Sequence, residues 1–119
     1  MTLLAALAAA GGSAHATPGG DAAKGAAAFD DRCSQCHTMG GVSQGPNLAG
    51  VIGRKAGTSP DFPYTAAMKG AGLTWTAANL ERFLASPQAV VPGTAMNVSV
   101  PSAAERANIV AYLATLKAH

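Results

Sequence analysis

The most regular spacing of apolar residues lies near the C-terminus and predicts an amphipathic helix. Its apolar positions recur at i, i+3, i+4 and i+7, as Ile109, Tyr112, Leu113 and Leu116. Just before them, Pro101 is followed by Ser102 and, three residues on, by Glu105, which is the pattern of a capping box. We therefore expect this helix to begin at about residue 102.

Three further segments carry helical patterns. Asp21 is a favourable N-cap residue and strong helix formers follow it, so we expect a helix over residues 21–33. Residues 76–86 show an apolar face and predict another helix, and residues 64–70 predict a short one. Because Gly25 costs the first helix about 1 kcal/mol relative to alanine, we expect the C-terminal helix to cross it at that point.

The remaining stretches are rich in glycine and proline and predict long loops. Residues 40–63 contain six glycines and three prolines without a clear periodicity, and we expect residues 86–101 to be extended for the same reason. The pattern as a whole predicts an all-α fold of three to five helices joined by long, ordered loops. With 119 residues, the chain has the length of one domain.

Composition adds a constraint on the core and on partners. Aromatic residues make up only 5% of the chain, so a core of this size would gain much from a bound group with a large apolar surface. The net charge is +2, and no basic cluster indicates binding to nucleic acid or to an anionic membrane surface. We therefore expect no nucleic-acid partner.

The first 16 residues have the composition of a secretory signal. A short apolar run, too short to span a bilayer, ends in the small-x-small pattern Ala14-His15-Ala16. No Lys or Arg precedes that run, so either the natural start lies upstream of Met1 or the signal is atypical. We expect residues 1–16 to be a secretory signal, residues 17–119 to form the domain, and the protein to be periplasmic.

The strongest chemical signal is the run Cys33-Ser34-Gln35-Cys36-His37. Cys-x-x-Cys-His is the attachment pattern of a c-type haem, in which both thiols form thioethers and the histidine ligates the iron. A thioredoxin-like dithiol would need a parallel sheet, and a zinc or iron–sulfur site would need about four ligands. A plain disulfide between Cys33 and Cys36 leaves the adjacent histidine without a role. One covalent haem c, with His37 on its iron, is the prediction.

The sixth ligand of the iron decides between two kinds of function. An open position would bind oxygen or other small ligands, whereas a second protein ligand prepares the iron for electron transfer. Met96 lies on a Pro-Gly loop far along the chain, and Met68 is its competitor; spacing alone does not separate them. Met39 follows His37 too closely, and His119 is the last residue of the chain.

A series of motifs in one fixed order identifies a family. The motifs are Gly20-Asp21 with Gly25 and Phe29, Cys33 to His37, Gly45-Pro46-Asn47-Leu48, Gly53-Arg54-Lys55-Ala56-Gly57-Thr58, Tyr64-Thr65, Leu73-Thr74-Trp75, Pro92-Gly93-Thr94-Ala95-Met96, and Ile109 with Tyr112 and Leu113. In these the chain resembles a class I cytochrome c of the mitochondrial and bacterial photosynthetic type, over essentially the whole region after residue 16. The resemblance implies the cytochrome c fold, wrapped around one covalently bound haem.

The resemblance also implies the ligands of the iron. It makes His37 the proximal ligand and Met96 the distal one, with the carbonyl oxygen of Pro46 accepting a hydrogen bond from the His37 ring. Methionine–histidine ligation raises the reduction potential, as suits a carrier late in a respiratory or photosynthetic chain.

Four more residues receive a role from the resemblance. Arg54, Tyr64 and Trp75 match the residues that hydrogen-bond a buried haem propionate, and Thr94 matches a hydroxyl near the distal pocket. Without the resemblance, the two aromatic side chains would be interpreted as core.

The chain departs from the family pattern at several positions. Phe83 stands where a tyrosine is usual, and Met68 where an asparagine is common. The ring of lysines that usually surrounds the haem edge is largely replaced, by Gln88, Ala89 and Ala95. Docking to a strongly acidic partner is therefore in question.

These features together predict a soluble one-electron carrier that is a monomer, binds no small-molecule substrate and is not an enzyme. Its expected partners are membrane or soluble redox proteins such as a cytochrome bc complex, a terminal oxidase, a reaction centre or a dehydrogenase. Two alternatives stay open: a haem domain or subunit of a larger oxidoreductase, and a ligand-binding or sensing haem protein with an open sixth position.

Overall fold

The computed structural model describes residues 19–38 and 41–117, and its regular elements there are all helices. They are α1 (Ala22–Arg32), α2 (Ala66–Lys69), α3 (Ala77–Ala85), α4 (Pro87–Val90) and α5 (Ala103–Leu113). Within those ranges no strand forms, although Lys55 and Thr74 make an isolated antiparallel bridge. The predicted all-α fold is confirmed. The predicted secretory signal over residues 1–16, Met39 and His119 lie outside the described residues. None of the described helices is long and apolar enough to cross a membrane.

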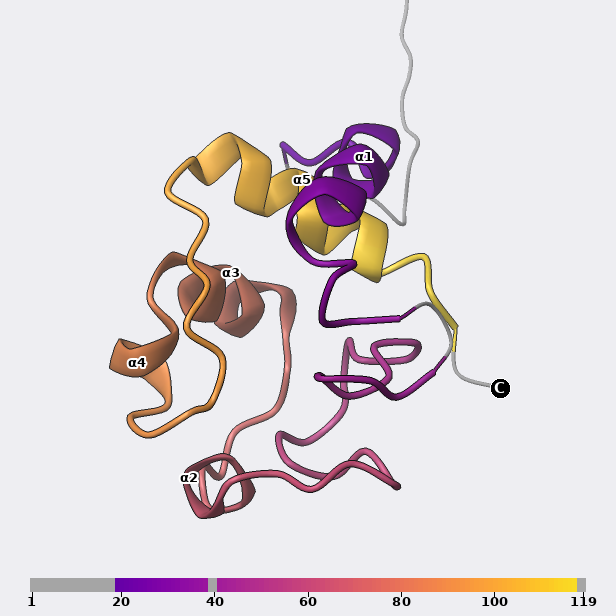
Figure 1. Cartoon of the computed structure of the whole chain (residues 1–119). Coiled ribbons are helices and arrows are strands. Elements are labelled where there is room, and N and C mark those ends of the chain that lie inside the picture. Colours follow the sequence, from indigo (N-terminus) through magenta and orange to yellow (C-terminus); the bar gives the residue numbers. More distant parts are fainter. Residues whose placement is uncertain (1–18, 39–40, 118–119) are drawn as a thin grey trace, which may run out of the picture.

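The two terminal helices cross each other at Gly25, as the sequence predicts (Figure 1). A Cβ atom on Gly25 would lie 1.8 Å from the carbonyl oxygen of Asn108, so only a glycine permits this approach. The side chain of Asn108 reinforces the crossing, because its Oδ1 accepts a hydrogen bond of 2.8 Å from the backbone N–H of Asp21. Near the crossing, the ring centroids of Phe29 on α1 and Tyr112 on α5 lie 5.5 Å apart.

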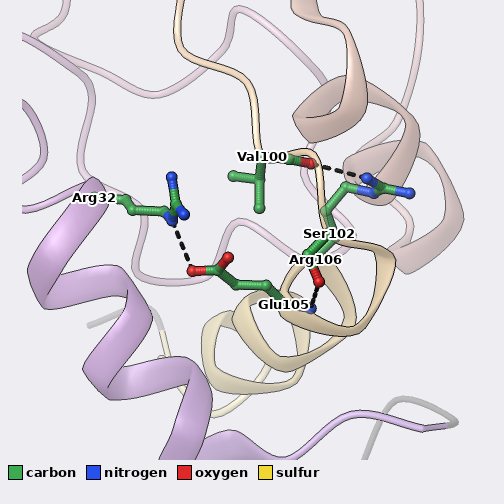
Figure 2. A network of polar contacts seen from close by, with 5 residues as sticks. All are labelled: Arg32, Val100, Ser102, Glu105 and Arg106. Atoms are coloured by element: carbon green, nitrogen blue, oxygen red, sulfur yellow. Dashed lines mark hydrogen bonds and ion pairs between the residues drawn. The ribbon is translucent and has the colours of Figure 1, made fainter.

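The three longer helices, α1, α3 and α5, each begin after a residue whose side chain caps the helix N-terminus. The side chain of Asp21 accepts from the N–H of Lys24 at the start of α1, and Thr76 caps α3 in the same way. Ser102 caps α5 by accepting from the N–H of Glu105 at 3.2 Å. The reciprocal half of the predicted capping box is replaced: the Glu105 carboxylate accepts a hydrogen bond of 2.6 Å from Arg32 Nε at the end of α1 (Figure 2).

One prediction about the loops is wrong. Residues 86–101 are not extended throughout, because Pro87–Val90 form the single turn α4. Pro87 occupies the first helical position, where its fixed φ suits the turn and its missing N–H is not needed. The helix predicted over residues 76–86 does end before this turn, since α3 ends at Ala85 and α4 begins two residues later. Residues 41–63 contain no helix, as predicted.

The core is a layer of buried side chains between α3, α5 and the loops. Leu80, Phe83 and Leu84 form the buried face of α3, as their spacing predicts, and Ile109 and Leu113 contribute from α5. Trp75 joins them through an edge-to-face contact with Phe83, with ring centroids 5.0 Å apart. These side chains pack around the site described below.

The Gly25 crossing can be tested by adding one methyl group. Helix propensity alone predicts that Gly25→Ala stabilises the protein by about 1 kcal/mol. The clash with the Asn108 carbonyl group predicts destabilisation instead. Because the backbone of α1 or α5 would have to move, the free energy of unfolding should fall by about 2 kcal/mol or more. Guanidinium unfolding of the haem-loaded protein, followed by far-ultraviolet circular dichroism, measures the difference.

A matched control lies in the same helix. Ala27 is exposed, so Ala27→Gly should cost only the propensity difference of about 1 kcal/mol. A Gly25→Ala protein more stable than the wild type would contradict the close crossing.

Candidate functional site

A cavity of about 360 Å³ occupies the centre of the molecule and is lined mainly by apolar side chains. Its walls come from α1, α2, α3, α5 and the loops between them, which surround the middle of the molecule in Figure 1. All nine site residues predicted from the sequence line it: Cys33, Cys36, His37, Pro46, Arg54, Tyr64, Trp75, Thr94 and Met96. The fold therefore brings together residues from most of the described chain.

The Cys-x-x-Cys-His run forms a turn directly after α1. Cys33 is the C-cap of that helix, and its carbonyl oxygen accepts from the N–H groups of Cys36 and His37 at 3.1 and 2.9 Å. The two half-buried thiols are not bridged to each other. Burial raises the pKa of the Cys33 thiol to about 11, so it is protonated at neutral pH. The turn presents two free thiols and an imidazole to one cavity.

The His37 ring is fixed in orientation by the loop that follows the turn. Its Nδ1 lies 3.0 Å from the carbonyl oxygen of Pro46 and donates to it when protonated. Burial lowers the pKa of His37, although the hydrogen bond to Pro46 acts in the opposite sense. The imidazole is therefore neutral at pH 7, with Nδ1 holding its proton, and Nε2 is left with a lone pair suited to a metal.

Gly45 is a site residue to which the sequence assigned no separate role. A Cβ atom at this position would lie 2.4 Å from Cε1 and 2.7 Å from Nδ1 of His37, so the backbone packs directly against the ring. The Gly45 N–H also donates to the carbonyl oxygen of Cys36 at 2.7 Å, which closes the loop onto the turn. The one available signal is its position immediately before Pro46.

Two methionines contribute to the cavity lining. Met96 is half-buried on the loop after α4, and its N–H donates to Oγ1 of the buried Thr94 at 3.3 Å. Met68 lines the same cavity from α2. Both thioethers are therefore near the site, and both are chemically able to bind a soft metal centre.

Arg54 places a positive charge in the wall of the cavity. Its two terminal nitrogens donate to the carbonyl oxygens of Asn47 at 2.9 Å and Ala49 at 3.3 Å. Its Nε is buried and, among the described residues, has no hydrogen-bond partner. Burial lowers the pKa of Arg54, yet a guanidinium remains protonated at any physiological pH. A half-buried guanidinium with one buried, unsatisfied N–H is suited to bind an anionic group.

The residues fit a haem c. The turn supplies two thiols and a neutral imidazole, the walls are apolar, and the Arg54 Nε lacks an acceptor that a carboxylate would provide. The Tyr64 hydroxyl also lines the cavity; it accepts from the N–H of Ser59 at 3.2 Å and keeps its own proton for another acceptor. A group with one large apolar face and carboxylate substituents would satisfy both the walls and Arg54.

Comparison with known proteins gives a consistent result. The Cytochrome c family model matches residues 22–117. The chain is 48% identical over 103 residues to the cytochrome c-type cyt cy of Rhodobacter capsulatus, which covers 85% of this chain and 52% of that protein. It is 44% identical over 107 residues to cytochrome c2 of Rhodomicrobium vannielii, covering 87% and 85% of the two chains. The chain thus spans about half the length of the R. capsulatus relative.

Solved structures show the same likeness. The structure of cytochrome cH from Methylobacterium extorquens superimposes with a TM-score of 0.77 at 41% sequence identity, covering 81% of this chain and 99% of the other. Cytochrome c2 from Rhodospirillum centenum gives a TM-score of 0.77 at 36% identity, covering 83% and 100%.

The packing of Gly45 on His37 generates a prediction. In the haem-loaded protein, Gly45→Ala should displace the imidazole from its hydrogen bond with Pro46, because the new methyl group would overlap the ring. We expect a changed axial ligand signature in electron paramagnetic resonance and a loss of about 1–3 kcal/mol in the free energy of unfolding.

The control for this substitution is Gly41→Ala in the same loop. Among the described residues outside its flanks, the nearest heavy atom is Thr38 Cγ2 at 4.0 Å, so the added methyl group has room there. A wild-type spectrum and stability for Gly45→Ala would show that Gly45 does not hold the ring.

Proposed function

The chain belongs to the cytochrome c family, and on that premise we propose that Cys33 and Cys36 hold its haem while His37 and Met96 ligate the iron. The protein carries one covalently bound haem c and is a monohaem electron carrier. It is not an enzyme in this proposal: it moves one electron at a time and takes no small-molecule substrate.

One observation supports the ligand assignment more than any other. His37, directly after α1, and Met96, on the loop after α4, line the same cavity although they are far apart in the sequence. The His37 ring is already held by Pro46 and Gly45, and the loop of Met96 is held by its own hydrogen bonds. Contacts within the protein would thus hold both ligands in place in either oxidation state of the iron.

The chain's own residues would tune the electron transfer. The haem supplies one-electron redox chemistry at its iron. A neutral thioether from Met96 and an apolar wall favour the less charged state and so raise the reduction potential. Pro46 keeps the proton on Nδ1 of His37. Arg54, Tyr64 and Trp75 would hydrogen-bond a buried propionate, whose negative charge Arg54 would offset. Thr94 supports the distal side through its bond to the N–H of Met96.

The cellular setting follows from the same proposal. We propose export by the segment 1–16 and function of the domain 17–119 as a monomer in the periplasm. Its donor and acceptor would be membrane or soluble redox proteins, such as a cytochrome bc complex, a terminal oxidase, a reaction centre or a dehydrogenase. Carriers of this kind dock through small, weak interfaces, below about 1,200 Å².

The charge distribution suggests how such docking would work. Gln88, Ala89 and Ala95 are exposed and uncharged where relatives commonly carry lysine. The net charge of +2 would be nearly cancelled by two haem propionates, so long-range steering should be modest.

Covalent attachment can be tested directly. The double substitution Cys33→Ala with Cys36→Ala should abolish the haem colour that stays with the wild-type polypeptide through denaturing electrophoresis, because no thioether can then form. Gln35→Ala changes an exposed residue between the two cysteines and should keep the colour. Release of the haem from the wild-type protein by acid and acetone would contradict thioether attachment.

The sixth ligand is tested by comparing the two methionines of the cavity. Met96→Ala should open the sixth position, allow carbon monoxide to bind the ferrous protein, and lower the reduction potential by on the order of 0.1 V, within the roughly 0.8 V that axial ligands control. Met68→Leu conserves volume and should keep the wild-type spectrum. The reverse result would assign the ligand to Met68, and carbon monoxide binding by the wild type would favour a sensing role.

A further inference from the structure

The side chain of Gln88 spans the loop that carries Met96. We define the methionine loop as residues 91–100, between α4 and the turn before α5. Gln88 projects from α4 and accepts a hydrogen bond from the Gly93 N–H at 3.0 Å through its Oε1. Its Nε2 donates to the carbonyl oxygen of Thr94 and to Oδ1 of Asn97, both at 2.8 Å. One side chain thus binds the loop on both sides of Met96.

The two ends of the methionine loop are held by separate contacts. At its start, the Thr94 N–H donates to the Val91 carbonyl oxygen at 2.9 Å, which forms a turn with Gly93 at φ 92°. At its end, the Val100 N–H donates to the carbonyl oxygen of Leu84 at 2.8 Å. The Val100 carbonyl oxygen in turn accepts from Arg106 Nη1 at 2.8 Å (Figure 2). Gln88 bridges the part between these two anchors.

The amide group is suited to this position because it both accepts and donates. A lysine at this position would offer three donors and no acceptor, so it could not accept from the Gly93 N–H. A glutamate could accept from Gly93 but would set its oxygens against those of Thr94 and Asn97. Gln88 does not belong to the cavity lining formed by the described residues, so it acts on the site only through the loop.

We propose that Gln88 is a positioning residue that keeps the methionine loop closed and so limits how often Met96 leaves the iron. The proposal rests on the ligation of the iron by Met96 proposed above. Because the three hydrogen bonds involve backbone atoms or a side chain within four residues of Met96, breaking them frees the segment that carries the thioether.

Imidazole binding to the ferric, haem-loaded protein measures the loop opening. Imidazole takes the sixth position only when Met96 has left, so its apparent dissociation constant is the intrinsic one divided by the open fraction. Each hydrogen bond is worth roughly a factor of two to ten in such an equilibrium. Gln88→Leu should therefore lower the apparent dissociation constant about tenfold, followed as loss of the absorbance band of methionine-ligated ferric haem.

Two more substitutions separate the parts of the interaction. Gln88→Lys loses the acceptor for Gly93, and Gln88→Glu loses the two donors and adds repulsion, so each should also tighten imidazole binding. Asn108→Ala is the matched control: it removes a side-chain bond of 2.8 Å to the backbone at the crossing of α1 and α5, away from the loop. It should lower the free energy of unfolding without changing imidazole affinity.

The outcomes are distinguishable. Wild-type imidazole affinity in all three Gln88 variants would overturn the proposal, and so would an equal shift in Asn108→Ala, which would reveal a general loss of stability. Amide hydrogen exchange at Gly93 gives a readout that does not depend on the ligand, and it should be faster in Gln88→Leu. If the wild type lacked the methionine band, the ligation by Met96 would be refuted, while unchanged exchange at Gly93 would refute the brace itself.

Discussion

At Gly25 the backbones of α1 and α5 approach so closely that a Cβ atom would lie 1.8 Å from the Asn108 carbonyl oxygen. This contact sets the direction in which α1 ends, and therefore where the turn from Cys33 to His37 faces. It also sets which face of α5 remains for the cavity, where Ile109 and Leu113 pack. The pair Arg32 and Glu105 then joins the end of α1 to the start of α5 at the surface, where such a pair adds little stability by itself.

Because the chain is small and has few aromatic residues, its own side chains do not fill the centre of the molecule. Its buried side chains form a layer, and the centre is a cavity of about 360 Å³ with an apolar wall. Arg54 lies in that wall with a buried Nε that no described residue satisfies, although its other nitrogens bind Asn47 and Ala49. Both features are completed by one planar apolar group with acidic substituents, so the haem is part of the core as well as the redox centre.

The two segments that carry the proposed iron ligands are held by different means. The His37 ring is confined locally, by the backbone of Gly45 and the carbonyl of Pro46 within nine residues. Met96 lies on a loop that is anchored at its ends and bridged by the side chain of Gln88. If His37 and Met96 ligate the iron as proposed, a fixed His37 ring and a braced Met96 loop would suit a carrier that rearranges little when its charge changes.

Features that depend on neighbouring residues along the chain could be predicted from the amino-acid sequence. The caps at Asp21 and Ser102 and the apolar spacings located α1, α3 and α5 to within one to three residues, because capping and periodicity act over about one helical turn. The Cys33 to His37 run defined the cofactor for the same reason: its chemistry is contained in five consecutive residues.

Contacts between segments distant in the sequence, and contacts between a side chain and a curved loop, could not be predicted in this way. Glu105 binds Arg32 rather than closing its capping box, because α1 brings a cation within 2.6 Å. Gly45 packs on a ring eight residues away, and Gln88 finds three partners along a loop whose curvature no periodic pattern encodes. Such contacts depend on the path of the backbone in space, which local propensities leave open.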